Sequence, residues 1–313
     1  MIAKPKSKRG RWQVAAVTTL AVTMGAALSL AGCAKNSSSP AASTTTPTAT
    51  SVAVTPARVE AIAATLPEEI RKSGKLVVGV TIPYTPNEFK DPDGKIVGFD
   101  VDLINAVAAT LGLTAEYRES DFAKIIPSIE GGTFNVGMSS FTDTKDREQQ
   151  VDFVTYFSAG SQWAQRTGAG IDPNNACGKK VSAMAASTQV TDELPAKSKA
   201  CVAAGKPEIQ IVTFDGQDAV TNAVVLGQVD AMSADSPVTA WAVKQSKGKL
   251  ETAGPIFDSA PYGWPVKKGS PLAASLQKAL EHLIDTGDYR TIVANWGLEA
   301  GAISKPVING AIN

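Results

Sequence analysis

The stretch Val136-Gly-Met-Ser-Ser-Phe-Thr-Asp-Thr-Lys-Asp-Arg147 joins a short apolar segment to a run of small hydroxyl side chains. Residues 134–138 predict a strand, and Asp143 or Thr144 can cap a helix whose first turn contains Arg147. Hydroxyls and free backbone N–H groups at such a junction favour an anion, because the helix dipole is positive there. The arginine adds a planar fork that can hold a carboxylate through two hydrogen bonds. The stretch therefore predicts a carboxylate site, with a capped surface helix and a solvated arginine as the alternative.

Strands and helices alternate on both sides of this stretch. Apolar periodicity predicts strands at residues 76–80, 114–117, 180–183, 209–214 and 229–232, and helices at residues 101–111, 122–129, 218–226, 237–245 and 272–286. Such alternation predicts an α/β fold with a mostly parallel sheet. Polar residues follow a strand in each half, at Ser139 and at Ser233. Because ligands bind at the carboxyl ends of parallel strands, two facing lobes would form a ligand cleft there.

The chain is expected to cross twice between two lobes. Residues 151–165 form a long extended stretch, and residues 260–266 predict a return strand, so the first lobe is discontinuous and hinged. The expected parts are a lipoprotein signal peptide at residues 1–32, a Ser/Thr/Pro/Ala-rich tether at 33–65, a first lobe at 66–162 and 258–300, a second lobe at 163–257 and a C-terminal tail at 301–313.

The N-terminus has the pattern of an exported lipoprotein. Residues 1–11 contain five basic residues and no acid, and an apolar run from Val14 to Leu30 follows. The sequence Leu30-Ala-Gly-Cys33 resembles the bacterial lipobox, in which the cysteine is diacylated and becomes the mature N-terminus. We therefore expect an exported protein that is lipid-anchored to the outer face of the bacterial cytoplasmic membrane. The alternative is a transmembrane anchor, for which the apolar run is at the short end.

The charge and the cysteines of the chain narrow the class of protein further. Beyond residues 1–11 the chain has 25 basic and 30 acidic residues, which removes the electrostatic case for nucleic-acid binding. With Cys33 lipidated, Cys177 and Cys201 remain as a pair in an oxidising setting and predict a disulfide, worth roughly 3 kcal/mol in the chain-entropy model. No C-x-x-C motif or histidine cluster predicts a metal site.

Residues 75–298 resemble the family 3 extracytoplasmic solute-binding proteins, the amino-acid receptors of ABC importers. The phrases that carry the resemblance are Gly98-Phe-Asp-Val-Asp102, Ile125-Ile-Pro-Ser-Ile129, Ser140–Arg147, Val151-Asp-Phe153, Val229-Asp-Ala231 leading to Asp235, and Tyr262-Gly263. The resemblance implies a type II periplasmic-binding-protein fold whose lobes close around one amino acid. It also implies a monomer without a cofactor, with the transmembrane subunits of an ABC permease as its partner.

The resemblance assigns ligand-binding roles to seven residues. Arg147 would grip the α-carboxylate with the help of Ser140 and Thr142. Thr188 would donate to the same carboxylate from the second lobe, and Asp235 would pair with the α-ammonium. Aromatic walls around the ligand side chain would come from Tyr84 and Phe122.

Local alternatives remain for several of these residues. Asp235 precedes Ser-Pro and can cap the next helix, Thr188 can be a turn residue, and Tyr84 and Phe122 can belong to the core. Asp100 and Asp102 have the pattern of helix caps or solvated helix acids, so we leave them out of the predicted site.

The sequence departs from the family pattern at two points. Relatives that bind basic residues or glutamine often have an acid just before the tyrosine, where this chain has Thr81 and Ile82; Glu88 restores a negative charge or lies in solvent. Ala186 stands where many members have glycine. The first departure argues against lysine, arginine or histidine and favours a polar uncharged or acidic amino acid, and the sequence leaves the identity of the ligand open.

The sequence also contains features of other classes of function. The S-x-x-K match at Ser275 and Lys278 lies inside a helix without its companion motifs, and His282 has no partners for a catalytic or zinc site. A dehydratase on the same fold would need a general acid or base, and no spare candidate is present. A ligand-sensing receptor domain is the remaining alternative, although no output domain follows the predicted fold before Asn313. We therefore expect a binding protein and not an enzyme.

Overall fold

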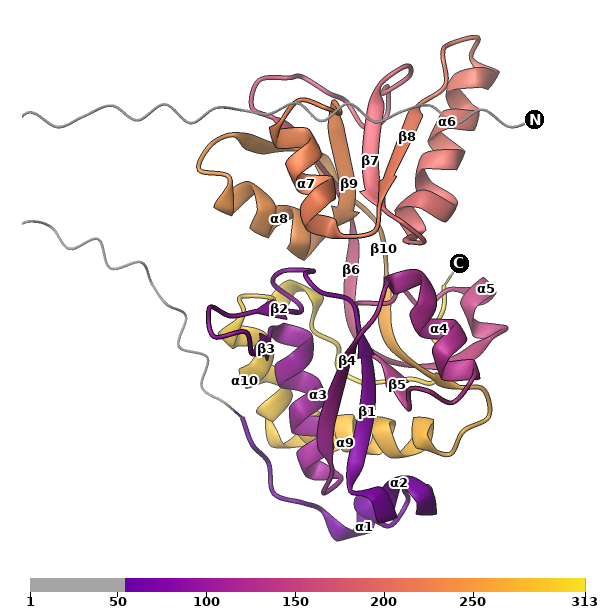
Figure 1. Ribbon diagram of the computed structural model, residues 1–313, viewed down its shortest axis with the longest axis vertical. Coiled ribbons are helices and arrows are strands. Elements are labelled where there is room, and N and C mark those ends of the chain that lie inside the picture. The colour runs from indigo at the N-terminus through magenta and orange to yellow at the C-terminus, as the bar shows by residue number, and fades with distance from the viewer. Residues whose placement is uncertain (1–53, 313) are drawn as a thin grey trace, which may run out of the picture. The chain divides into compact units, whose positions relative to one another are not determined.

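The computed structural model describes residues 54–312 (Figure 1). The predicted signal peptide, the lipidation site Cys33 and the tether as far as residue 53 lie outside the described residues. The rest of the predicted tether folds onto the first lobe, which corrects the expectation for residues 54–65. Its helix α1 (Glu60–Ala63) ends in a fully buried alanine, and Val59 N–H donates to the Thr110 carbonyl at 2.9 Å. Apolar residues such as Ile62 pack on the core and order this segment despite its polar surroundings.

One mixed sheet runs through the described part of the chain. Its eight strands lie in the order β4-β1-β5-β10-β6-β9-β7-β8. Their bounds are β1 (Lys75–Val80), β4 (Thr114–Glu119), β5 (Val136–Gly137), β6 (Val151–Arg166), β7 (Lys180–Met184), β8 (Gln210–Phe214), β9 (Ala231–Asp235) and β10 (Leu250–Lys267). A separate hairpin pairs β2 (Phe89–Lys90) with β3 (Ile96–Val97) around the turn at residues 91–94.

The sheet is divided between two lobes that each contain a parallel part. In lobe I, β1 pairs in parallel with β4 and β5; in lobe II, β7 pairs in parallel with β8 and β9. The helices of lobe I are α2 (Glu68–Ser73), α3 (Phe99–Thr110), α4 (Phe122–Glu130), α5 (Lys145–Glu148), α9 (Leu272–Thr286) and α10 (Asp288–Asn295). Lobe II has a π-helical turn (Gln189–Glu193), α6 (Leu194–Ala203), α7 (Gln217–Val225) and α8 (Ser236–Gln245). A short 3-10 turn (Glu299–Gly301) follows α10.

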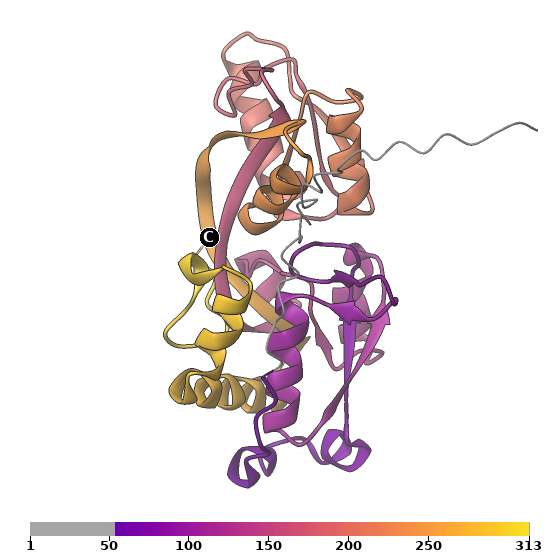
Figure 2. The same cartoon turned by 90° about the vertical axis from the view of Figure 1, so that its left-hand side faces the viewer.

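Two long strands connect the lobes. β6 and β10 pair antiparallel along most of their length and lie side by side in both views (Figures 1 and 2). At one end Val266 of β10 pairs with Val136 of β5, and at the other Ser161 of β6 pairs with Asp235 of β9. The register shifts between residues 253 and 263 of β10 break the ladder where the strands pass between the lobes. Such irregularities bend a strand pair and suit a hinge.

Helix α3 begins two residues earlier than the sequence pattern predicts. Its N-cap is Gly98, with φ at +141°, and a Cβ at this position would come within 2.1 Å of the Asn87 carbonyl oxygen. Only glycine tolerates that approach. Asp100 is therefore not the N-cap; it lies within the first turn, on the buried side of the helix together with Ile104 and Val107.

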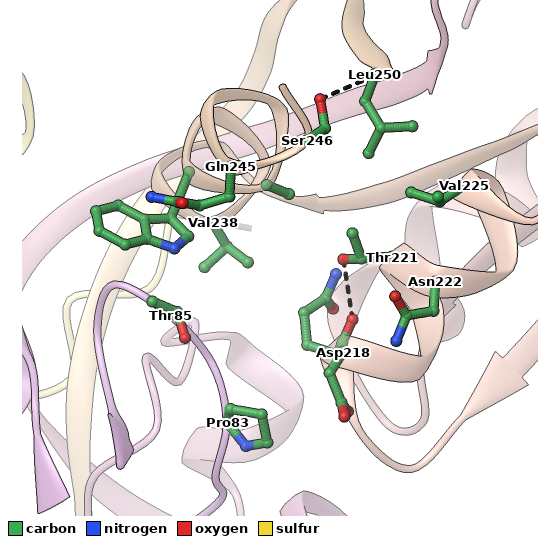
Figure 3. A pocket seen from close by; sticks show the side chains of 13 residues that line it. Pro83, Thr85, Asp218, Thr221, Asn222, Val225, Val238, Gln245, Ser246 and Leu250 are labelled. Atoms are coloured by element: carbon green, nitrogen blue, oxygen red, sulfur yellow. Dashed lines mark hydrogen bonds between the residues drawn. The ribbon is translucent and has the colours of Figure 1, made fainter. Parts of the chain in front are cut away.

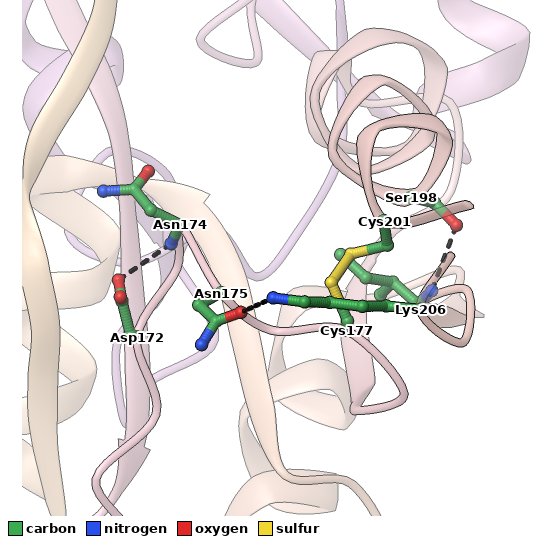
Figure 4. The surroundings of a disulfide bond; sticks show 8 residues. Asp172, Asn174, Asn175, Cys177, Ser198, Cys201 and Lys206 are labelled. Atoms are coloured by element: carbon green, nitrogen blue, oxygen red, sulfur yellow. Dashed lines mark hydrogen bonds between the residues drawn. A yellow bond between two sulfur atoms is a disulfide. The ribbon is translucent and has the colours of Figure 1, made fainter. Parts of the chain in front are cut away.

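The predicted disulfide is present between Cys177 and Cys201 (Figure 4). It joins the loop before β7 to α6, with a Cα–Cα distance of 5.5 Å and a sequence separation of 24 residues. Next to it, Lys206 Nζ donates to Asn175 Oδ1 at 2.9 Å and fastens the turn that follows α6 to the same loop. The bridge closes a loop of lobe II that contains Thr188, one of the predicted site residues.

Candidate functional site

The predicted carboxylate stretch connects β5 to α5 in lobe I. β5 contains only two residues, and α5 is a single turn of four residues, so both elements are shorter than the sequence pattern suggests. Thr144 is the N-cap, and its hydroxyl accepts from Arg147 N–H at 3.3 Å. Because so short a helix has little dipole, the charge of Arg147 must supply most of the attraction for an anion.

Arg147 lies on a stacked aromatic pair and reaches across to the other lobe. Its guanidinium carbon is 5.5 Å from the ring centroid of Phe122 and 5.6 Å from that of Phe141, and the two rings stack at 4.2 Å. One terminal nitrogen donates to the Thr142 carbonyl at 2.8 Å, and the other donates to the Ala186 carbonyl of lobe II at 3.0 Å. Burial lowers the pKa of Arg147 to about 10, which leaves the side chain charged at neutral pH.

Ala186 keeps the backbone conformation that glycine favours. Its φ is +62°, in the left-handed region that costs most side chains about 1 kcal/mol or more. This conformation turns its carbonyl toward Arg147. Alanine stands at position 186 in place of the glycine that many family members have. This replacement leaves the hydrogen bond between Arg147 and the backbone of lobe II in place.

Asp235 lies at the end of β9, facing the same space from lobe II. It occupies the N-cap position of α8, but its side chain makes no capping hydrogen bond. The carboxylate instead accepts from Tyr84 Oη at 2.7 Å, from Tyr262 Oη at 2.8 Å and from Gln189 Nε2 at 2.9 Å. Burial raises its pKa, and the three hydrogen bonds oppose that rise. The helix-cap alternative fails, because the carboxylate accepts from these three side chains and makes no capping hydrogen bond.

A single small cavity between the lobes brings the predicted residues together. All seven line it: Tyr84, Phe122, Ser140, Thr142, Arg147, Thr188 and Asp235. Four further residues line it beside these seven, namely Ser139, Met184, Ser187 and Gln189. The cavity volume is about 10 Å³, comparable to the space of one water molecule. An amino acid is larger, so the lobes must separate before one can bind.

Two larger hollows flank this cavity. One, of about 650 Å³, extends outward from Arg147 and Thr188 between α5 and α6. The other, of about 290 Å³, lies between the loop of Pro83 and Thr85 in lobe I and helices α7 and α8 (Figure 3). The walls of both come from both lobes, so their volumes change when the lobes move apart. Neither hollow is lined by both Arg147 and Asp235.

Asp100 is buried and supports the site, contrary to the sequence-based interpretation. It is fully buried and accepts from the backbone N–H of Ser140 at 3.0 Å, from the Ser140 hydroxyl at 3.1 Å and from Tyr156 Oη at 2.7 Å. Ser140 has φ at +50°, and these bonds hold it in that strained conformation. Asp102 is half-buried and accepts from Trp296 Nε1 at 2.9 Å. The burial of Asp100 could have been predicted from its helical spacing to Ile104, because that spacing places both residues on one face of the helix.

Glu88 is also fully buried, which excludes the solvated alternative for this residue. Burial and the neighbouring charge of Asp100 raise the pKa of Glu88 above its ordinary value. Burial also raises the pKa of Asp100, to about 6. The interior beside the cavity therefore contains three acidic groups, counting Asp235, and one guanidinium.

Within residues 54–312, no cluster of histidine, cysteine or acidic side chains has the makeup of a metal site. No helix in that range is long and apolar enough to span a bilayer.

Comparison with known proteins gives concordant matches. The sequence profile of the bacterial extracellular solute-binding proteins, family 3, matches residues 76–299. The chain is 41% identical over 258 residues to the arginine-binding protein ArgT of Corynebacterium glutamicum, covering 82% of this chain and 85% of the relative. It is 29% identical over 235 residues to the glutamine-binding protein GlnH of Bacillus subtilis, covering 72% and 82%. The solved structure of an ancestral arginine-binding protein bound to arginine superposes with a TM-score of 0.66 at 34% identity, covering 72% of this chain and 98% of that one.

Proposed function

Because the chain belongs to the bacterial extracellular solute-binding proteins of family 3, we propose that it acts as a monomer that closes its two lobes around one amino acid and delivers it to the permease subunits of an ABC importer. The fold is the type II periplasmic-binding-protein fold, in agreement with the sequence-based prediction. The relatives reported above are named as binding proteins, which supports a receptor and not an enzyme.

The arrangement of Arg147 and Asp235 carries the proposal. The two groups come from different lobes and line one cavity, with aromatic rings of Tyr84 and Phe122 beside them. An amino-acid zwitterion needs a fixed cation and a fixed anion in such a partly dry site, because each of its charges must be paired when it leaves water. Arg147, Ser140, Thr142 and Thr188 would receive the carboxylate, and Asp235 would receive the ammonium.

Ligand binding would exchange contacts that now join the lobes directly. Arg147 donates to Ala186 of lobe II, and Tyr84 of lobe I donates to Asp235 of lobe II. A ligand carboxylate can take the place of the Ala186 carbonyl, and a ligand ammonium can join the donors around Asp235. The closed state is then stabilised by contacts that one ligand makes with both lobes.

The charge of the site favours a basic ligand, with arginine as the first candidate. Asp100 and Asp235 accept hydrogen bonds as carboxylates beside a single guanidinium, so an acidic side chain would add a like charge to this interior. The raised pKa of Glu88 favours its neutral form. The 41% identity to an arginine-binding protein supports the same conclusion. This proposal departs from the preference for a polar uncharged or acidic ligand that the sequence suggested. Glutamine is the second candidate, since the Bacillus subtilis relative is named for it.

Calorimetric titration of the soluble chain from Ala34 onward, freed of co-purified ligand, should detect arginine as the tightest binder among arginine, lysine, histidine, glutamine and glutamate. At a free arginine concentration of 100 times the dissociation constant, binding should also raise the free energy of unfolding by about 2.7 kcal/mol, as measured by thermal unfolding. Tighter binding of glutamate than of arginine would overturn the basic assignment. Binding of none of the twenty amino acids by folded protein would overturn the receptor proposal itself.

We further propose that a diacylated Cys33 anchors the protein to the outer face of the bacterial cytoplasmic membrane. The support is the basic, apolar and lipobox-like order of residues 1–33. Cells fed a radiolabelled fatty acid should label the wild-type chain and leave a Cys33→Ser variant unlabelled. Equal labelling of the two chains would rule out Cys33 as the anchor.

A further inference from the structure

The C-terminal segment Pro306–Ala311 lies along an open edge of the lobe I sheet. Residues 151–157 of β6 pair with β10 on one side, and the segment covers their other side. Thr155 N–H donates to the Val307 carbonyl at 2.9 Å, and Asn309 N–H donates to the Phe153 carbonyl at 3.0 Å. The segment thus acts as an added edge strand, and it lies outside residues 76–299, which the family profile matches.

Asn309 turns this segment toward the ligand site. Its φ is +57°, a left-handed conformation that asparagine tolerates better than most residues. Its side chain fixes the turn, because Oδ1 accepts from Phe153 N–H at 2.9 Å and Nδ2 donates to Asp152 Oδ1 at 3.0 Å. The two residues that follow therefore have a defined direction.

Those two residues contact the carboxylate stretch directly. Gly310 N–H donates to Asp143 Oδ2 at 2.7 Å, and Ala311 N–H donates to Glu148 Oε1 at 3.0 Å. Asp143 and Glu148 lie on either side of Arg147 in the sequence, and Figure 1 shows the C-terminus beside α5. A Cβ on Gly310 would come within 3 Å of methyl groups of Val307 and Thr155, so a larger residue there would force these side chains to shift.

The stretch that contains Arg147 is consequently held from two sides. On one side, Asp143 N–H donates to the Pro261 carbonyl of β10, and Gly263 N–H of the same strand donates to the Phe141 carbonyl, both at 2.9 Å. On the other side are the two C-terminal N–H donors. Helix α5 has one turn and cannot fix an arginine side chain by itself.

We propose that residues 306–311 are a positioning element of the ligand clamp, holding Asp143 and Glu148 so that the guanidinium of Arg147 faces the ligand carboxylate. This inference rests on the proposed amino-acid site. It adds a segment outside the family match to the machinery that sets affinity.

The inference is tested by two truncations of the soluble chain, one that removes residues 306–313 and one that removes only residues 312–313. The longer deletion should weaken arginine binding about tenfold or more, mainly through faster dissociation, at a temperature well below the unfolding transition. The shorter deletion removes none of the bonds described and should bind as the wild type does. An Ala311→Pro variant removes the N–H donor to Glu148 and restricts the backbone of Gly310. It covers the case in which the longer deletion fails to fold, and its affinity should fall in the same direction.

Amide hydrogen exchange of residues 145–150 in the absence of arginine provides a readout that does not depend on ligand identity. Loss of the C-terminal donors should speed exchange there about tenfold, while exchange in α6 of lobe II stays unchanged. Unchanged affinity together with unchanged exchange in a folded variant would overturn the positioning role. Faster exchange in a protein that binds no amino acid would leave the positioning intact and remove the proposed function instead.

Discussion

Replacing Arg147 with alanine should weaken amino-acid binding by a factor of about 100 to 1,000, or roughly 3–4 kcal/mol. The guanidinium is the one cation among the residues lining the small cavity. Its loss would leave the ligand carboxylate unpaired in a site with low water content, and it would also remove the donors to the Thr142 and Ala186 carbonyls. Calorimetric titration with the preferred amino acid measures the effect, and thermal unfolding confirms that the variant is folded.

Two comparisons separate the clamp from a general effect of charge. Arg118→Ala removes an exposed arginine of lobe I whose partner is Glu116, and it should bind as the wild type does. Agmatine, which is arginine without the carboxylate, should bind wild type and Arg147→Ala with similar affinity, because it offers the arginine nothing to grip. If Arg147→Ala binds arginine within threefold of wild type, the clamp assignment is wrong.

The local part of this site could be predicted from the sequence, because its members are close along the chain. The hydroxyls at Ser140 and Thr142 and the fork of Arg147 occupy eight consecutive residues, so their spacing alone indicates an anion site. Asp235 was assigned through the family resemblance, because its position before Ser-Pro is by itself also typical of a helix cap. The structure groups these residues around one cavity, while their contacts with a ligand stay predictions.

The partners of these residues could not be predicted, because they come from distant segments. Tyr84 reaches Asp235 across 151 residues, and Gln189 reaches it across 46. Tyr262 belongs to a phrase that carries the family resemblance, yet nothing local indicates that its hydroxyl is directed at Asp235. The burial of Asp100 was missed for a related reason, since an acid in the first turn of a helix is ordinarily solvated or stabilises the helix dipole.

Element lengths were also beyond local reasoning. Residues 134–138 are apolar enough for a strand, but only Val136 and Gly137 belong to β5. Phe134 instead packs over Gly79, where a Cβ would come within 2.3 Å of its ring. The sequence predicted residues 301–313 only as a C-terminal tail. Their contacts with the α5 region are made by backbone N–H groups, and such groups have no sequence signature.

Asp235→Asn should weaken binding of the preferred amino acid by about 2–5 kcal/mol. Asparagine keeps the size of the side chain, and its oxygen can still accept from Tyr84 or Tyr262, so the variant removes chiefly the negative charge. The ammonium of the ligand would then lie buried without a counter-charge, close to the positive charge of Arg147. Isothermal titration at neutral pH measures the loss, and Asp215→Asn, an exposed acid of the same lobe, is the matched control.

An N-acetylated form of the ligand makes this experiment specific for the charge pair. It lacks the ammonium, so wild type should bind it far more weakly than the free amino acid, and Asp235→Asn should discriminate much less between the two. A variant that weakens both ligands by the same factor would show that Asp235 acts through its hydrogen bonds to Tyr84 and Tyr262, joining the lobes without pairing with the ligand. The ratio of the two affinities therefore distinguishes direct recognition of the ammonium from stabilisation of the closed state, because only the former depends on the charge that acetylation removes.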